Sequence, residues 1–226
     1  MVSLFSHIGL GDIFLLSGAI VKLLERYGKL RIYCYFMHEV SVRSLFAAYP
    51  DIQIVPVPRG NSWYGLPDEH ALRPAVDGNI LRCGFYAAQG VRHDISFPEL
   101  FYAQLGVPYK ERWDSCPVEK AALAVDQLET NLEVFVHDDA ARGFNITKGI
   151  DSQRVLRPIE NDGASILQYV NILRKMRKIH CMDSVFYHLV ESLLGITAEL
   201  YYHRYPRLYI PGWFDYPRRY KWTDLV

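Results

Sequence analysis

VSLFSHIGLGDIFLLSGAIVKLLERY, residues 2–27, passes from a short apolar segment through a loop with two glycines into a long apolar segment. The first part, 2–6, has the length and composition of a strand, and 13–27 has the length of a helix. A strand that runs through a glycine turn into a helix presents free backbone N–H groups and the positive end of the helix dipole. At the start of a βαβ pattern, this is where an α/β protein commonly binds its ligand.

The loop at 7–12 carries the candidate chemistry of this region. It contains Gly9 and Gly11 and matches neither Gly-x-Gly-x-x-Gly nor a P-loop. Asp12 stands where a small residue or a lysine would serve a phosphate, and a carboxylate repels phosphate but can take a proton from a hydroxyl. Asp12 is therefore a candidate base, although a helix N-cap is the alternative. His7 is expected either beside a ligand or in the core.

The composition describes a globular protein with a large core. Half of the 226 residues are hydrophobic, and 25 basic residues balance 25 acidic ones. This neutral balance argues against a nucleic-acid binder, and no uncharged apolar run reaches the ~18 residues of a transmembrane helix. No signal-peptide pattern is present. The four cysteines are scattered and lack metal-site spacing, so we expect reduced thiols in a cytoplasmic protein.

Strand and helix patterns alternate along the chain, which predicts parallel sheets. A linker pattern near 109–117 separates two such halves, and we expect domains at 1–115 and 116–226. Residues 59–80 have the composition of a loop. The further strands are expected at 31–36, 52–57, 79–84, 133–137, 154–158, 178–182 and 197–202, and the further helices at 40–49, 97–105, 118–131, 165–176 and 184–194.

Three short motifs resemble the heptosyltransferase-type glycosyltransferases, which have the GT-B fold. Two lie in the first half: GLGD at 9–12 after the first strand, and AYPD at 48–51 before the third. The third, IHCMDSVFYHL at 179–189, resembles that family's strand-to-helix motif of Asp-Ser/Thr-Gly followed by a histidine. Val185 replaces the usual glycine, and the chain is roughly 100 residues shorter than a usual enzyme of this kind, given ordinary domain sizes.

The resemblance implies an α/β fold with two Rossmann-like domains facing each other across a cleft, a compact GT-B arrangement. It also implies transfer of a sugar from a nucleotide-sugar donor to an acceptor hydroxyl, with Asp12 as the base and without a cofactor. Asp183, Ser184 and His188 would bind the donor. The serine would contact the diphosphate, and the histidine would orient the loop or touch the donor. The alternative for these three residues is a helix cap and a structural histidine.

A second group of candidates follows the strand expected at 133–137. Arg142 lies in the next loop, where a guanidinium suits bidentate binding of the donor phosphates. A solvated loop arginine is the alternative. His137 is expected near the cleft, and Asp138 and Asp139 follow it. Histidine–aspartate pairs also ligate metals, but there the ligands stand on helices, so we expect no metal here.

The acceptor is expected to be a glycan or glycolipid. The tail from Trp213 to Trp222 is aromatic and basic, which suits either a peripheral contact with lipid or sugar, or a closing helix whose long cationic side chains reach water. Two other functions remain open. One is an epimerase or hydrolase of sugar nucleotides, which needs an acid and a base flanking the sugar. The other is a non-catalytic binding subunit, which a filled cleft near Asp12 would favour.

Overall fold

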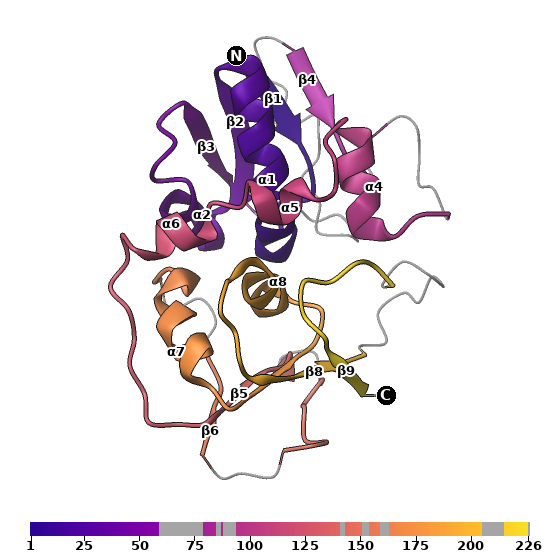
Figure 1. The fold of residues 1–226 in the computed structure, drawn as a ribbon. Coiled ribbons are helices and arrows are strands. Elements are labelled where there is room, and N and C mark those ends of the chain that lie inside the picture. Colours follow the sequence, from indigo (N-terminus) through magenta and orange to yellow (C-terminus); the bar gives the residue numbers. More distant parts are fainter. Residues whose placement is uncertain are drawn as a thin grey trace.

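The computed structural model describes residues 1–58, 79–84, 87, 94–140, 143–150, 154–158, 163–204 and 215–225. Within them the chain forms two parallel β-sheets, one from each half of the sequence. Helices α5, α6 and α8 lie between the sheets in the middle of the molecule (Figure 1). None of the described helices is long and apolar enough to cross a membrane.

The first sheet has the order β3-β2-β1-β4, and every neighbouring pair is parallel. Its strands are β1 Val2–Phe5, β2 Leu30–Tyr35, β3 Ile52–Val57 and β4 Asn79–Arg82. Helix α1, Leu10–Tyr27, connects β1 to β2, and η1, Phe36–His38, with α2, Glu39–Leu45, connects β2 to β3. The carboxyl ends of all these strands therefore meet at one edge, beside the N-terminus of α1.

The second sheet has the order β6-β5-β7-β8-β9 and is also parallel. Its strands are β5 Val134–His137, β6 Val155–Leu156, β7 Lys178–Cys181, β8 Glu199–His203 and β9 Thr223–Leu225. The helices that accompany it are η5 Ile166–Tyr169, α7 Val170–Lys175 and α8 Val185–Ser192. Between the sheets in sequence come α4 Phe97–Gln104, α5 Glu111–Asp114 and α6 Val118–Ala122.

The two halves share one apolar core. Helix α1 buries a wide stripe of its surface, and its side chains belong to the same cluster of buried residues as those of α8 and the second sheet. Leu16 and Ile20 from α1 and Leu189 from α8 are all at most 1% exposed. Each such side chain contributes about 1.5–3 kcal/mol on burial. The boundary at 115/116 stays a prediction, but the apolar core is continuous across it.

A glycine lets α5 pack directly on α1. A Cβ atom at Gly18 would lie 1.8 Å from the carbonyl oxygen of Glu111 and 3.2 Å from the Cα atom of Arg112. The obstacle is backbone, which cannot rotate away as a flexible side chain can. The absent side chain at Gly18 therefore fixes where α5, and with it Arg112, sits against the rest of the molecule.

The C-terminal tail is anchored by a buried carboxylate. Glu191 on α8 is 0% exposed and accepts hydrogen bonds from the backbone N–H groups of Arg219 and Tyr220 and from Nε1 of Trp222. The tail then adds β9 to the edge of the sheet, so its end is a strand and not the closing helix considered above. Trp222 is buried by this packing and cannot contact lipid; Trp213 lies outside the described residues.

Most expected elements are present, several of them shorter than expected: the helix expected at 40–49 is Glu39–Leu45, and the strand expected at 154–158 is Val155–Leu156. The first helix begins at Leu10, three residues earlier than expected, so Asp12 belongs to the helix. The expected linker at 109–117 contains α5. Helix α6 ends at Ala122, nine residues earlier than expected, and the carbonyl oxygen of Ala122 accepts from Nε2 of Gln127. Most of the expected loop at 59–80 lies outside the described residues.

Gly18→Ala is expected to destabilise the protein by about 1–3 kcal/mol, the usual effect of overpacking a well-packed core. At an unobstructed position in a helix the same change stabilises by up to about 1 kcal/mol, because alanine is the better helix former. Chemical denaturation of the wild type and the variant measures the sign. A gain in stability would show that α5 does not pack against Gly18 as described.

Candidate functional site

The first turns of two helices meet between the sheets. A Cβ atom at Gly11 on α1 would lie 3.4 Å from the backbone nitrogen of Val185 and 3.5 Å from Cδ2 of His188, both on α8. The positive ends of two helix dipoles, one from each half of the chain, are therefore adjacent. Both helices follow the carboxyl end of a parallel strand, β1 or β7, which is the edge where α/β proteins bind ligands.

Asp12 stands in the first turn of α1, at its third residue. Gly9 is the N-cap residue and makes no side-chain cap hydrogen bond, so the interpretation of Asp12 as the N-cap residue is wrong. The carboxylate folds back over Gly9, because a Cβ atom there would lie 2.9 Å from Oδ2 of Asp12. A carboxylate in the first turn stabilises a helix through its dipole, and this one is partly exposed beside the contact between α1 and α8.

His7 lies in an aromatic environment behind the glycine turn. Its imidazole is 5.4 Å from the ring of Phe97 and 5.0 Å from that of Phe101, and the side chain is 7% exposed. Burial lowers the pKa of His7 from 6.5 to about 4, so the ring is neutral at pH 7. These contacts support the packing role; a contact of His7 with a ligand stays a prediction.

The N-terminus of α8 is held to the end of β5. Ser184 is the N-cap, and its Oγ accepts from the backbone N–H of Tyr187 at 3.5 Å. The same hydroxyl is hydrogen-bonded to Nδ1 of His137 at 2.9 Å. The imidazole of His137 in turn lies 4.7 Å from the ring of Phe186. Two residues expected at the site, Ser184 and His137, are thus in direct contact, and the serine hydroxyl serves the helix cap.

Three ionisable side chains form a chain on the other side of this turn. Nδ1 of His188 lies 3.2 Å from Nη2 of Arg112, and Nε2 of His188 lies 3.5 Å from Oδ1 of Asp183. Arg112 is 1% exposed, and Nη1 donates to the hydroxyl of Tyr109 at 2.5 Å. Burial, and next the charge of Arg112, hold the pKa of His188 well below its usual range. The imidazole is therefore neutral.

Arg112 is the one member of this group that the sequence did not indicate. It lies in the segment expected as a linker, and no local motif distinguishes it from a solvated arginine. The only signal was its aromatic neighbours Tyr109 and Trp113, whose rings lie 5.8 and 5.5 Å from the guanidinium carbon. Its contact with His188 joins residues 76 positions apart and exists only in the folded chain.

The loop after β5 is described in part. Arg142 lies outside the described residues. Asp138 accepts from the backbone N–H of Ile146 and pairs with Arg157, so this carboxylate holds the loop together. Among the described residues no group of three or more His, Cys, Asp or Glu side chains could hold a metal ion. We therefore derive no step through a metal.

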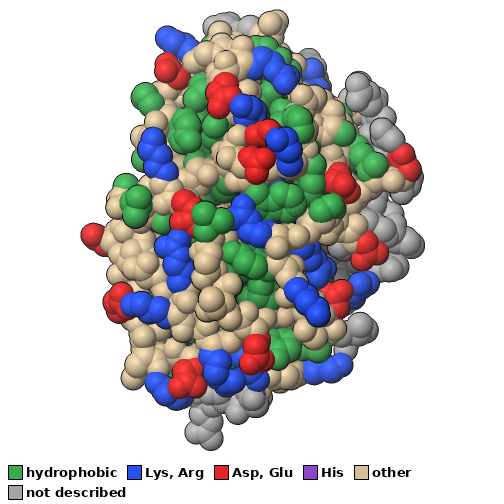
Figure 2. All heavy atoms as spheres, viewed as in Figure 1, with side chains coloured by type: hydrophobic (Ala, Val, Ile, Leu, Met, Phe, Trp, Pro, Cys, Tyr) green, Lys and Arg blue, Asp and Glu red, His purple; other side chains and the backbone are tan. Residues whose placement is uncertain are grey.

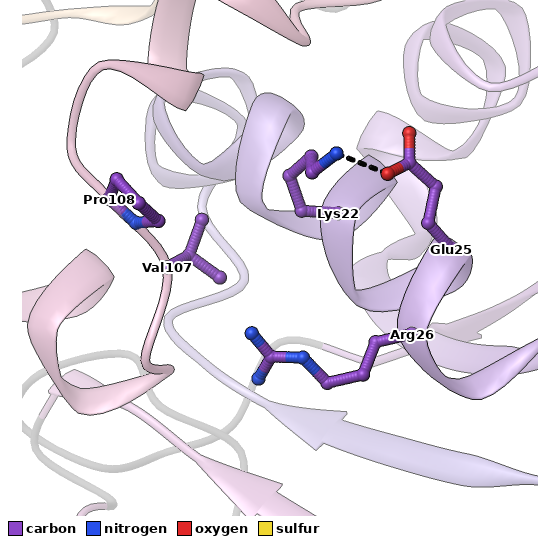
Figure 3. A pocket seen from close by; sticks show the side chains of 5 residues that line it. All are labelled: Lys22, Glu25, Arg26, Val107 and Pro108. Carbon is purple, nitrogen blue, oxygen red and sulfur yellow. Dashed lines mark hydrogen bonds and ion pairs between the residues drawn. The ribbon is translucent and has the colours of Figure 1, made fainter.

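Two cavities lie apart from the contact between α1 and α8. One, of about 280 Å³, is lined by Lys22, Glu25, Arg26, Val107 and Pro108 at the far end of α1 (Figure 3). Lys22 stands about 15 Å along the helix from Asp12, at the usual rise per residue. The other, of about 260 Å³, includes Met182, His203 and Leu225 at the carboxyl edge of the second sheet.

Charges of both signs are mixed on the face of the molecule shown in Figure 2. On the face shown in Figure 2, the described Lys and Arg side chains alternate with Asp and Glu side chains and with apolar ones. This mixture agrees with the equal numbers of basic and acidic residues in the chain. The positive potential that matters for an anionic ligand must therefore come from local groups, such as helix N-termini.

Three of the solved structures that resemble this chain are of glycosyltransferases. The iron-containing dodecameric glycosyltransferase TibC from enterotoxigenic E. coli H10407 superposes with a TM-score of 0.51 at 12% identity, covering 89% of this chain and 57% of TibC. E. coli heptosyltransferase WaaC, solved with ADP, superposes with a TM-score of 0.50 at 10% identity. The superposition covers 94% of this chain and 89% of WaaC. TibC has also been solved with ADP-D-beta-D-heptose, again with a TM-score of 0.50 at 10% identity.

These comparisons confirm the fold expected from the sequence, a GT-B arrangement of two Rossmann-like parallel sheets. The chain spans little more than half the length of TibC. No protein-family model and no curated protein matches the sequence. At 10–12% identity the likeness establishes the fold and not the activity.

The buried His7 predicts a pH dependence of stability. Its folded pKa, about 4, is below the unfolded value of 6.5, so the unfolded chain binds more protons between these values. Stability is therefore complete above pH 6.5 and falls as the pH drops toward 4, by up to about 3 kcal/mol from this residue. His7→Phe cannot titrate, and denaturation at pH 7, 5.5 and 4.5 should show a shallower decline than in the wild type. If the free energy of unfolding fell equally with pH in the wild type and in His7→Phe, the burial of a neutral His7 would be contradicted.

Proposed function

We propose that the protein is a glycosyltransferase that moves a sugar from a nucleotide-sugar donor to an acceptor hydroxyl. The observation that carries this proposal is the meeting of two helix N-termini from opposite sheets. One carries Asp12, a carboxylate suited to take a proton, and the other follows Asp183 and Ser184, at a turn suited to a phosphate. A fold shared with two glycosyltransferases that were solved with ADP or an ADP-sugar supports the same reaction class.

The donor diphosphate is assigned to the N-terminus of α8. The first-turn N–H groups and the dipole of this helix favour an anion, and the hydroxyl of Ser184 lies at the same end. Arg142, which follows β5 in the sequence, is proposed to contribute a guanidinium to the phosphates. These groups would stabilise the charge that develops on the leaving diphosphate, so the proposed reaction uses protein groups in place of a metal ion.

The acceptor is assigned to the α1 side, and a glycan or glycolipid hydroxyl is the proposed nucleophile. Its oxygen attacks the anomeric carbon of the donor sugar, and the bond from that carbon to the diphosphate breaks. The bonding electrons leave with the diphosphate, and the hydroxyl proton passes to the carboxylate of Asp12. We propose the cytoplasm as the compartment, in keeping with the four cysteines, which are all free thiols.

One observation favours a second candidate function. At Gly11 the first turns of α1 and α8 are so close that a single Cβ atom there would already be in van der Waals contact with Val185 and His188. A non-catalytic subunit that binds a nucleotide sugar without transferring the sugar fits this closed contact. The two candidates differ in one measurable respect, because both bind the donor and only the enzyme releases nucleoside diphosphate when an acceptor is present.

Asp12→Asn tests the role of the base. If Asp12 takes the proton, the transfer rate should fall by roughly 10²–10⁴, the usual contribution of general-base catalysis. Stability should change by no more than about 1 kcal/mol through the helix dipole. The donor is first chosen from a panel of nucleotide sugars by thermal shift. The rate is then measured as nucleoside diphosphate released with a panel of glycan acceptors, in the presence of EDTA.

Glu25→Gln is the matched control, because Glu25 is an exposed carboxylate near the other end of α1. It removes the same charge from the same helix and should leave the rate unchanged. Equal rates for Asp12→Asn and Glu25→Gln would remove Asp12 from the mechanism. Loss of turnover with EDTA and recovery with Mg²⁺ would instead assign the leaving-group charge to a metal.

Arg142→Ala tests the donor side. Loss of a hydrogen bond to a charged group should weaken the binding of a nucleoside diphosphate by about 1.5–3 kcal/mol. Calorimetric titration measures this, with Arg154→Ala as the control, because Arg154 pairs with Glu133 away from the α8 turn. Equal affinities of the two variants would exclude Arg142 from the site.

A further inference from the structure

Arg112 is a buried cation that touches no reacting group in the proposed mechanism. Burying a guanidinium costs several kcal/mol unless it is paired and hydrogen-bonded. The contacts of Arg112 are the Tyr109 hydroxyl, Nδ1 of His188 and three aromatic rings, of which that of Tyr216 lies 5.5 Å away. Two of these partners, His188 and Tyr216, belong to the half of the chain that carries the donor turn.

The hydrogen bond from Arg112 determines which nitrogen of His188 carries the proton. A guanidinium has donors and no acceptor, so Nδ1 of His188 must accept. A neutral imidazole has one N–H, which must then be on Nε2. Nε2 lies 3.5 Å from Oδ1 of Asp183, so its N–H faces that carboxylate. Arg112 therefore donates to His188, and the remaining N–H of His188 lies beside the carboxylate of Asp183.

We propose that Arg112 is a positioning residue for the donor turn: by occupying Nδ1 it fixes His188 in the Nε2–H tautomer, which holds the carboxylate of Asp183. The proposal rests on the proposed function only in naming the ligand of this turn. The tautomer itself is a property of the protein alone. The same contact couples α5 in the first half of the chain to α8 in the second.

The effect on an anionic ligand follows from the position of Asp183. It directly precedes the N-cap Ser184, where a carboxylate competes with a phosphate for the same N–H groups and dipole. Held by His188, the carboxylate has a partner of its own. Without Arg112, the His188 imidazole can place an unprotonated nitrogen beside Asp183, or it can take up a second proton. In either case the contact between His188 and the carboxylate of Asp183 changes.

The geometry of α5 keeps Arg112 in place. Its backbone lies directly on Gly18 of α1, and its guanidinium carbon lies 5.8 Å from the ring of Tyr109 and 5.5 Å from that of Trp113. Arg112 therefore has little freedom to follow α8 if the two halves separate. An opening between α1 and α8 would break the Arg112–His188 bond first, so the tautomer of His188 also reports on that contact.

Nitrogen-15 NMR of histidine-labelled protein tests the proposal, with the His188 signal identified by its absence in His188→Gln. In the wild type without ligand, His188 should be the neutral Nε2–H tautomer. In Arg112→Met, which removes the donor and keeps a long apolar side chain, it should become the other tautomer, a mixture or the imidazolium. Tyr109→Phe is the matched control, because it removes a partner of Arg112 and not the bond to His188.

Titration with ADP gives the functional readout. Arg112→Met should bind ADP about tenfold more weakly than the wild type, and Tyr109→Phe should bind it with nearly the wild-type affinity. Two results would overturn the proposal. One is an Nδ1–H tautomer or a protonated His188 in the wild type, a result that does not depend on whether Arg112→Met folds. The other is an unchanged Nε2–H tautomer in Arg112→Met. If ADP and other nucleoside diphosphates fail to bind the wild type, the proposed function fails while the NMR result still decides the tautomer.

Discussion

The close approach of backbone to α1 at two glycines is the constraint on which the rest of this structure depends. Gly11 and Gly18 stand seven positions apart, about two turns, and so lie on the same face of the helix. The first admits the N-terminus of α8 and the second admits α5. A Cβ atom at Gly18 would collide with the backbone of α5, whereas one at Gly11 would be in ordinary contact with α8, so that only a larger side chain there would push α8 away. The meeting of the two helix N-termini, the place of Arg112 and the continuous core all follow from that face of α1.

Two buried charges connect the elements that this packing brings together. Arg112 links α5 to His188 on α8, and Glu191, also on α8, holds the C-terminal tail through three hydrogen bonds. The partners in these links are neutral groups, and a hydrogen bond to a charged group contributes about 1.5–3 kcal/mol. Both links converge on α8, the helix whose N-terminus is assigned to the donor. The position of that helix is therefore fixed from both of its neighbours, α5 and the tail.

The sequence predicted those features that depend on local pattern. Apolar runs located β1, β3 and β7 to within a residue, and Asp183-Ser184 stands at a strand-to-helix turn as its motif indicated. The start of α1 was missed because Gly9 caps it without a side chain. Arg112 was missed because its partner is 76 positions away and its two aromatic neighbours, Tyr109 and Trp113, do not by themselves mark a buried cation. The site thus combines motifs that can be found in the sequence with a contact that only the packing creates.

The central claim is that the first turn of α8, beside that of α1, binds the diphosphate of a nucleotide. A crystal structure of the protein with a nucleoside diphosphate tests it most directly. The account predicts phosphate oxygens within hydrogen-bond distance of the backbone N–H groups after Ser184, with Asp12 across the contact and Asp183 still beside His188. A nucleotide bound elsewhere, such as in the cavity beside His203, with the α1–α8 contact unoccupied, would contradict it.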